Sequence, residues 1–274
     1  MSKKPDEQPS KTSEVYTQLL AVATASKNGE KMDPTVPPMN EENRQWLESA
    51  LKEMSQYSDP VRNLKAAISR LKRTGEGDDL EELQRSVDAL IDLVCDLDLA
   101  LDFCKLEGLK IVEELLSKFS DSINQRVIPI ISEISQNNPS VQQQVLKTKL
   151  FENLLLLLDE SSGTTSAITR LKIVGAISAI VKQYPPAVIR FIQLGGLETV
   201  MQTFDSAIKN GDARLVLRCV VMVVNSKRSA APELLKRLSI NPEVYYERMR
   251  SALKSSGESD KYNEALEYLE SDPV

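Results

Sequence analysis

FCKLEGLKIVEELL, residues 103–116, occurs three times in this 274-residue chain in slightly altered form. The second copy is VLKTKLFENLLLLL at 145–158, which starts 42 residues later, and the third is FIQLGGLETVMQTF at 191–204, a further 46 residues on. Spacings of about 40–47 residues are typical of helical solenoid repeats. The chain is therefore predicted to be all-α, with three helices in each repeat.

Each copy shows the same order of helices. Short first helices are predicted at 101–106, 141–146 and 187–194. The second helices carry apolar stripes at helical spacing, namely Leu109, Val112 and Leu116, then Phe151, Leu154 and Leu158, then Leu197, Val200 and Phe204. Longer third helices are expected at 122–135, 169–183 and 213–226, with 86–101 as the counterpart before the first copy. Because no repeat can bury its apolar stripe alone, neighbouring repeats must stack.

Glycine marks the bend between the first two helices in two copies. Gly108 and the pair Gly195-Gly196 stand where a positive φ or a close backbone approach is needed. The middle copy has Lys149-Leu150 instead, so its bend must be made differently.

Composition excludes most catalytic chemistry. The chain has no histidine, which removes Ser-His-Asp and Cys-His arrangements and the commonest metal ligand. It has no GxGxxG or P-loop motif. The scattered Cys95, Cys104 and Cys219 are expected to be buried reduced thiols rather than a disulfide framework or a metal site. We expect no enzyme activity, no catalytic residue, no metal site and no cofactor.

The N-terminus and the apolar runs bear on location. MSKKPDEQPSK is charged and lacks the apolar core of a secretion signal, and the apolar run Cys219–Val224 is far too short to cross a bilayer. These features predict a cytoplasmic protein, with a nuclear location also open, that binds no membrane.

Charge is segregated along the repeats. Between Asp78 and Glu107 ten acidic residues face two basic ones, and the spacing of Asp88, Asp92 and Asp96 predicts one acidic helix face. From Thr164 to Arg190 there are basic residues and no acid. The inner surface of the solenoid should therefore be negative at one end and positive at the other, which would orient a protein partner. A net charge of −6 argues against nucleic acid.

Four segments resemble a known family. They are PPMNEENRQWLESAL (37–51), DALIDLVCDLDLALDFCKLEGLKIV (88–112), ISQNNPSVQQQVL (134–146) and TRLKIVGAISAIV (169–181). In this order they resemble the armadillo-repeat nucleotide exchange factors of the Hsp70 chaperone, the Hsp70-binding protein 1 family, in its cytosolic branch. The resemblance implies a right-handed α-solenoid of armadillo-like repeats with capping helices at both ends.

The family's activity implies where a partner would bind. Its members hold the chaperone's nucleotide-binding domain in the concave face, open the ATPase cleft and release ADP and substrate. The polar residues of the third helices are the candidate contacts, namely Asp92, Asp96, Asp98, Glu133, Gln136, Lys172, Ser178 and Lys182.

The regions outside the repeats divide as follows. Residues 1–36 are expected to be mostly disordered, 37–76 to form N-terminal capping helices, 77–240 the repeats and 241–274 C-terminal capping helices. The uncharged stretch 15–25 is either a short packing helix or, by similarity to the family's leading segment, a mimic of substrate that enters the chaperone's peptide-binding domain. Its residues in that role would be Val15, Tyr16, Leu19, Leu20 and Val22.

Two other readings stay open. A general armadillo adaptor for extended peptides would present Trp and Asn regularly on its third helices, but the only Trp, Trp46, lies outside them. A scaffold for ubiquitin ligases or signalling enzymes would form stable complexes without a chaperone. In each case we expect a monomer.

Overall fold

The computed structural model describes two units of the chain, 1–59 and 60–274. Its described residues are 41, 42, 45, 46, 49, 59–76, 79–118, 120–159, 165–238, 240–257 and 259–271. In the first unit the described residues before Asp59 are helical. The predictions for 1–36, including the substrate-mimic segment 15–25, lie outside the described residues.

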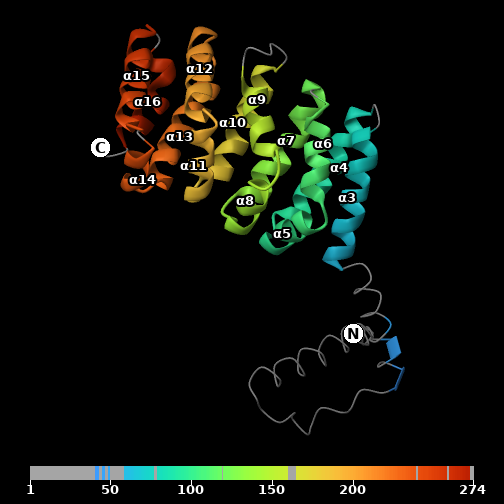
Figure 1. Cartoon of the computed structure of the whole chain (residues 1–274). Coiled ribbons are helices and arrows are strands. Elements are labelled where there is room, and N and C mark those ends of the chain that lie inside the picture. The colour runs from blue at the N-terminus through green and yellow to red at the C-terminus, as the bar shows by residue number, and fades with distance from the viewer. Residues whose placement is uncertain are drawn as a thin grey trace, which may run out of the picture. The chain divides into compact units, whose positions relative to one another are not determined.

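The second unit is a row of helices, and no strand occurs in the part of it that the structure describes (Figure 1). Its helices are α3 (Pro60–Glu76), α4 (Leu80–Val94), α5 (Leu97–Lys105), α6 (Gly108–Leu116), α7 (Asp121–Ser135), α8 (Pro139–Val145), α9 (Leu150–Leu158), α10 (Ala167–Val181), α11 (Pro185–Gln193), α12 (Gly196–Lys209), α13 (Ala213–Ser229), α14 (Pro232–Arg237), α15 (Pro242–Ser255) and α16 (Asn263–Glu270), with a short 3-10 turn at Ser259–Tyr262. None of these described helices combines the length and hydropathy that a bilayer span requires.

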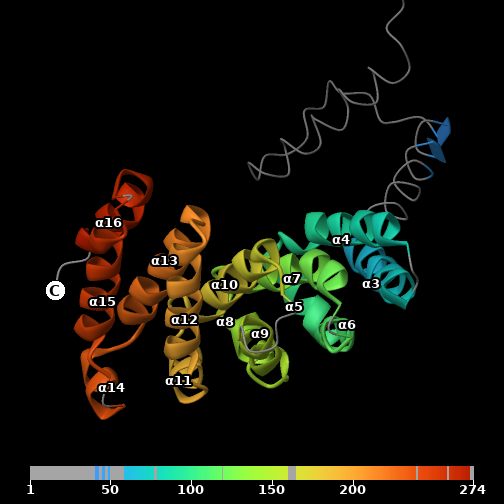
Figure 2. The same ribbon diagram turned by 90° about the horizontal axis from the view of Figure 1, so that it is seen from above.

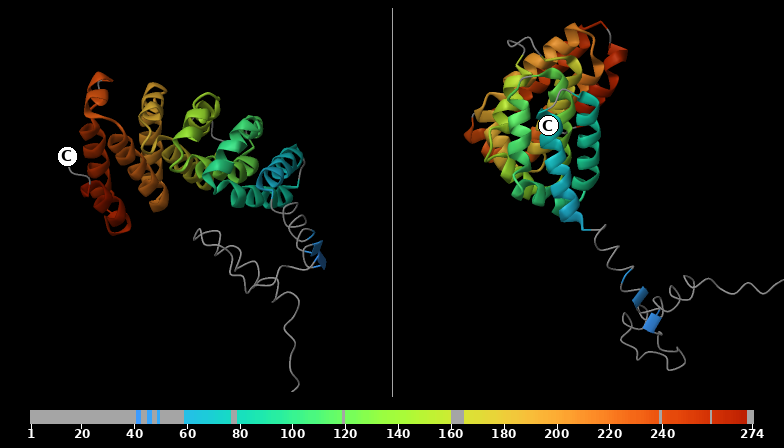
Figure 3. Two further views of the ribbon diagram at one scale, coloured as in Figure 1. Left: turned by 90° about the horizontal axis from the view of Figure 1, so that it is seen from below. Right: turned by 90° about the vertical axis from the view of Figure 1, so that its right-hand side faces the viewer.

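The helices stack in parallel rows. The third helices α4, α7, α10, α13 and α16 each pack on the next, and α6, α9, α12 and α15 form a second row behind them. Figure 2 shows the first row along one side of a curved stack, and Figure 3 shows the stack from below and end-on. The predicted α-solenoid of three-helix repeats is confirmed.

The predicted apolar stripes form the core. Leu109, Val112 and Leu116 of α6 are buried, as are their counterparts in α9 and α12, Phe151, Leu154, Leu158, Leu197, Val200 and Phe204. At about 25 cal/mol per Å² of apolar surface, burial between repeats is the main stabilising contribution.

The bends between first and second helices use two kinds of glycine. Gly195 has a φ of +75°, which glycine adopts at little cost. Gly196 instead allows close packing, because a Cβ there would lie 2.2 Å from the ring of Phe191. Gly108 likewise makes room for the ring of Phe103, while Glu107 takes the positive φ of +61°.

The middle repeat solves the same packing problem with different side chains. Val145 stands five residues before Leu150, where the other copies have Phe and Gly at the same spacing. Both residues are fully buried. A smaller first residue and a larger second one fill a comparable space.

The predicted helix 86–101 is wrong, because the chain breaks within it. α4 ends at Val94, and Asp96 is the N-cap of α5, where its carboxylate accepts hydrogen bonds from the backbone N–H of Asp98 and Leu99. An aspartate is a favoured N-cap and starts a new helix there. Asp96 therefore does not share a helix face with Asp88 and Asp92.

The C-terminal helices continue the rows. α15 packs on α12, and α16 packs on α13 as a further third helix. The last turn of α13 holds both, with Lys227 Nζ 5.1 Å from the ring centroid of Tyr246 and the Arg228 guanidinium 5.6 Å from that of Tyr268. The segment 241–274, which was expected to cap the solenoid, thus also adds α16 to the row of third helices.

Candidate functional site

A groove of about 790 Å³ runs across the row of third helices. It is bounded by residues of α4, α7, α10, α13 and α16, together with residues just after α7 and α10. Its lining residues are Ile91, Pro129, Ser132, Glu133, Gln136, Leu171, Lys172, Gly175, Ser178, Ala179, Lys182, Gln183, Arg218, Val221, Asn225, Arg228, Ser229 and Tyr268.

Five of the eight predicted contact residues line this groove. They come from two neighbouring third helices and the residues that end them, and are Glu133, Gln136, Lys172, Ser178 and Lys182. Asp92, Asp96 and Asp98 are exposed but do not line it. Asp96 and Asp98 belong to the start of α5, so the helix break separates them from the groove.

Asp92 lies near Glu133, the acidic residue of the groove lining. Desolvation, together with the neighbouring carboxylates of Glu133 and Asp92, raises the pKa of the Cys95 thiol. The three side chains are therefore grouped where α4 meets α7. A thiol with a raised pKa is a weak nucleophile, so this group carries charge rather than reactivity.

Polar and basic residues of α7, α10 and α13 follow the repeat. Arg126, Lys172 and Arg218 are spaced by 46 residues each, and so are Gln136, Lys182 and Arg228. Each series has one residue from each of the helices α7, α10 and α13, except that Gln136 and Lys182 directly follow the ends of α7 and α10. The repeat therefore places a basic residue at the same position of three successive repeats in the first series, and Gln, Lys and Arg at equivalent positions in the second.

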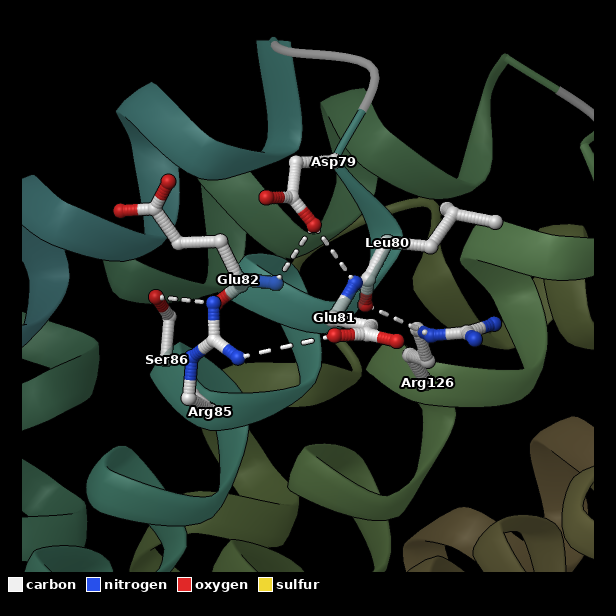
Figure 4. A network of polar contacts seen from close by, with 7 residues as sticks. All are labelled: Asp79, Leu80, Glu81, Glu82, Arg85, Ser86 and Arg126. Carbon is white, nitrogen blue, oxygen red and sulfur yellow. Dashed lines mark hydrogen bonds and ion pairs between the residues drawn. The ribbon is translucent and has the colours of Figure 1, made fainter.

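Two side chains of the first series form hydrogen bonds to the neighbouring repeat. Arg126 Nε donates to the carbonyl of Leu80 at 3.0 Å, at the start of α4 (Figure 4). Figure 4 also shows Asp79 capping that helix, with its carboxylate accepting from the N–H of Glu81 and Glu82 at 2.9 Å. Arg126 thus joins α7 to a helix start that is already capped.

Lys172 makes the equivalent link one repeat later. Its Nζ donates to the carbonyl of Gln125 at 2.7 Å. Pro129 lies inside α7 and has no N–H to give to that carbonyl four residues earlier. Desolvation, and then the charge of Arg126, lowers the pKa of Lys172.

The groove is basic toward the C-terminal end. Its charged lining residues are four cations, Lys172, Lys182, Arg218 and Arg228, against the single acid Glu133. Lys182 has no hydrogen-bond or ion-pair partner for its ammonium among the described side chains. Arg218, Arg228 and Tyr268 were not among the contacts predicted from the sequence, although a step of 46 residues from Lys172 and Lys182 leads to the two arginines.

The cysteines and acids of the described ranges form no metal site. Burial raises the pKa of Cys104 to about 12 and raises that of Cys219 further. Such thiols are inert packing residues. The expectation of a buried thiol is wrong for Cys95, which is exposed just after the end of α4. The groove itself offers charge, hydrogen-bonding groups and a floor that is open at Gly175, where a Cβ would meet no atom within 4 Å. Such an arrangement suits binding of another macromolecule.

Sequence comparisons identify relatives of the groove region. Residues 99–226 match the model of the SIL1/FES1/HPBP1 C-terminal domain. Hsp70-binding protein 1 of Mus musculus is 30% identical over 201 residues, which cover 70% of this chain and 55% of the relative. Nucleotide exchange factor SIL1 of Xenopus laevis is 25% identical over 232 residues, covering 78% and 47%. The chain spans about half the length of the curated relatives it matches.

The fold is similar to that of solved armadillo proteins. A designed armadillo repeat protein, YIII(Dq)4CqI, superposes with a TM-score of 0.57 at 19% identity, covering 86% of this chain and 96% of the other. At that identity the likeness concerns the fold alone.

The predicted cytoplasmic or nuclear location is wrong as a conclusion from this sequence. The matches include SIL1 as well as Hsp70-binding protein 1, and SIL1 resides in the endoplasmic reticulum. The charged N-terminal residues and the short apolar runs therefore assign no compartment.

Proposed function

The chain belongs to the SIL1/FES1/HPBP1 family, and we propose that it is a nucleotide exchange factor for an Hsp70 chaperone that holds the chaperone's nucleotide-binding domain in its groove. It acts as a monomeric co-chaperone in protein folding and quality control. Binding does the work, with no catalytic side chain and no cofactor.

The mechanism is binding linkage. A protein that binds the open form of the nucleotide-binding domain more tightly than the ADP-closed form shifts the population toward the open form. The shift is limited by the difference between the two affinities. ADP must in turn weaken the grip on the chaperone by the same factor.

The observation that carries this proposal is the groove across α7, α10 and α13, which brings together Glu133, Gln136, Lys172, Ser178 and Lys182. It lies mainly within the residues that match the family domain. Its side chains supply charge and hydrogen bonds, and no pair of them forms a nucleophile and base. A long groove on packed helices, lined by charged and hydrogen-bonding side chains, suits a grip on a folded domain.

Release of fluorescent ADP from a purified Hsp70 tests the proposal. The complete chain should accelerate release when present at substoichiometric amounts, because one molecule serves many chaperones in turn. An unchanged rate would refute exchange activity. A stable complex with Hsp70 and no acceleration would instead favour the adaptor reading.

The N-terminal segment has a separate proposed role. Residues 15–25, with Val15, Tyr16, Leu19, Leu20 and Val22, would enter the chaperone's peptide-binding domain and help a bound polypeptide leave. The support is their uncharged, apolar character within a polar region. This role is independent of the groove and is tested by its own deletion, described below.

A further inference from the structure

The groove continues past the residues that match the family domain. That match ends at residue 226, whereas Arg228, Ser229 and Tyr268 also line the groove. Tyr268 comes from α16, which packs directly on α13. The C-terminal helices therefore supply one end of the wall that faces a bound partner.

Tyr268 differs from the other tyrosines of this region. Tyr246 is buried under Lys227, and the hydroxyl of Tyr262, which is buried, lies 3.5 Å from the carbonyl of Ile208. The Tyr245 hydroxyl donates to Glu198 at 3.2 Å. Tyr268 is only partly buried, and its hydroxyl makes no hydrogen bond to any residue that the structure describes.

The ring of Tyr268 is nevertheless held in place. The Arg228 guanidinium lies 5.6 Å from its centroid, within cation–π range. Arg228 is itself exposed and lines the groove. The pair thus presents a hydroxyl beside a cation, and the contact between the two side chains reduces the entropy that they lose on binding.

We propose that Tyr268 and Arg228 together contact an acidic patch on the nucleotide-binding domain held in the groove. The contact would determine how tightly this chain binds an Hsp70 and which Hsp70 it prefers. This inference rests on the proposed function. The charge of the groove supports an acidic patch, since Arg218 and Arg228 come from α13, on which α16 packs, and Lys182 follows α10, on which α13 packs. Tyrosine and arginine are also the residues most enriched at energetic centres of protein interfaces.

The test measures binding of the full chain to the nucleotide-binding domain of an Hsp70 by calorimetry. Tyr268→Phe removes the hydroxyl and keeps the ring under Arg228, and it should weaken binding by about 3- to 10-fold, the effect of one hydrogen bond. Arg228→Glu should weaken binding by about tenfold or more, because it reverses the charge that faces the acidic patch.

Tyr245→Phe is the matched control. It removes a tyrosine hydroxyl from the adjacent helix α15, whose partner Glu198 does not line the groove. Its affinity should stay within about twofold of wild type. Melting temperatures of Tyr268→Phe and Tyr245→Phe show whether either substitution destabilises the C-terminal helices. The proposal requires that Tyr268→Phe lowers the affinity and leaves the melting temperature unchanged.

The outcomes separate the two proposals. If wild type binds and accelerates ADP release but Tyr268→Phe and Arg228→Glu bind equally well, the contact at α16 is refuted and the exchange function stands. If wild type itself neither binds nor accelerates release, the exchange function is refuted, and this inference with it.

Discussion

Lys172 supplies Gln125 with the hydrogen bond that Pro129 withholds. The Nζ of Lys172 in α10 lies 2.7 Å from the carbonyl oxygen of Gln125 in α7, and proline at position 129 has no N–H to reach that oxygen. This groove cation therefore also joins α7 to α10. Its removal should affect stability before it affects binding.

Lys172→Met should lower the free energy of unfolding by about 1–3 kcal/mol, because a charged hydrogen bond is lost and a carbonyl is left unpaired. Urea unfolding followed by circular dichroism measures the change. In a Pro129→Ala background the same substitution should cost less than about 0.5 kcal/mol, since the restored backbone N–H pairs with Gln125. Equal costs in both backgrounds would contradict this account of Lys172.

Gly196→Ala should destabilise the protein by about 1–3 kcal/mol, because the new methyl group would overlap the Phe191 ring. Gly175→Ala is the control within α10, where open space surrounds the position. It should raise stability by about 0.5–1 kcal/mol through helix propensity. Thermal unfolding of the two variants should give shifts of opposite sign, and shifts of the same sign would show that the space around each glycine does not decide its effect.

Lys182→Glu should weaken binding to Hsp70 by about tenfold, because it reverses a groove charge that has no partner within the described structure. Lys110→Glu makes the same change on an exposed residue of α6 outside the groove and should leave the affinity unchanged. Asp92→Arg tests the acidic residues near Glu133 in the same binding assay, a pull-down with Hsp70. If Lys182→Glu and Asp92→Arg both bind like wild type, the charged surface does not orient the partner.

Deletion of residues 1–36 should leave the rate of ADP release unchanged and slow the release of a peptide bound to Hsp70. The two rates separate because the groove lies in the second unit, whereas the apolar stretch 15–25 lies in the first. Stopped-flow fluorescence with labelled ADP and labelled peptide measures both. Equal peptide release with and without the segment would exclude a substrate mimic.

Asp121 should add stability that is lost in acid. Its carboxylate accepts from the N–H of Ser166 at 3.1 Å, joining α7 to the start of α10. Desolvation acts to raise the pKa of Asp121, but hydrogen bonds from Thr169 and Ser166 outweigh it and the pKa is lowered. The stabilisation is therefore complete above the unfolded pKa of about 3.9 and disappears as the pH falls through the lower folded pKa. The melting-temperature advantage over Asp121→Asn should be present at pH 7 and shrink below about pH 4, and an advantage independent of pH would contradict it.

The repeats could be predicted from the sequence because every repeat must bury an apolar stripe, so the same pattern recurs along the chain. Apolar residues such as Val112 and Val200 recur at helical spacing, and each must be buried by the next repeat. The break at Asp96 was missed because helical periodicity runs through it, although the side chain is a favoured cap. At this position the cap formed by Asp96 ends the periodic stretch and starts a new helix.

The groove was only partly predictable. Lys172 and Lys182 were found from their position on a third helix, and the 46-residue register would have added Arg218 and Arg228. Tyr268 gave no such signal, because α14 to α16 do not repeat the sequence pattern of the earlier helices. Its place beside Arg228 depends on how α16 docks, which only tertiary packing determines.

The row from α4 to α16 also gives the molecule a mechanical property. Each rung touches mainly the rungs next to it, so a small tilt at one contact is passed on and added to the tilts that follow. We therefore expect the stack to bend more easily along its length than within a single repeat. Hydrogen bonds between repeats, such as those from Arg126 to Leu80 and from Lys172 to Gln125, should resist this bending.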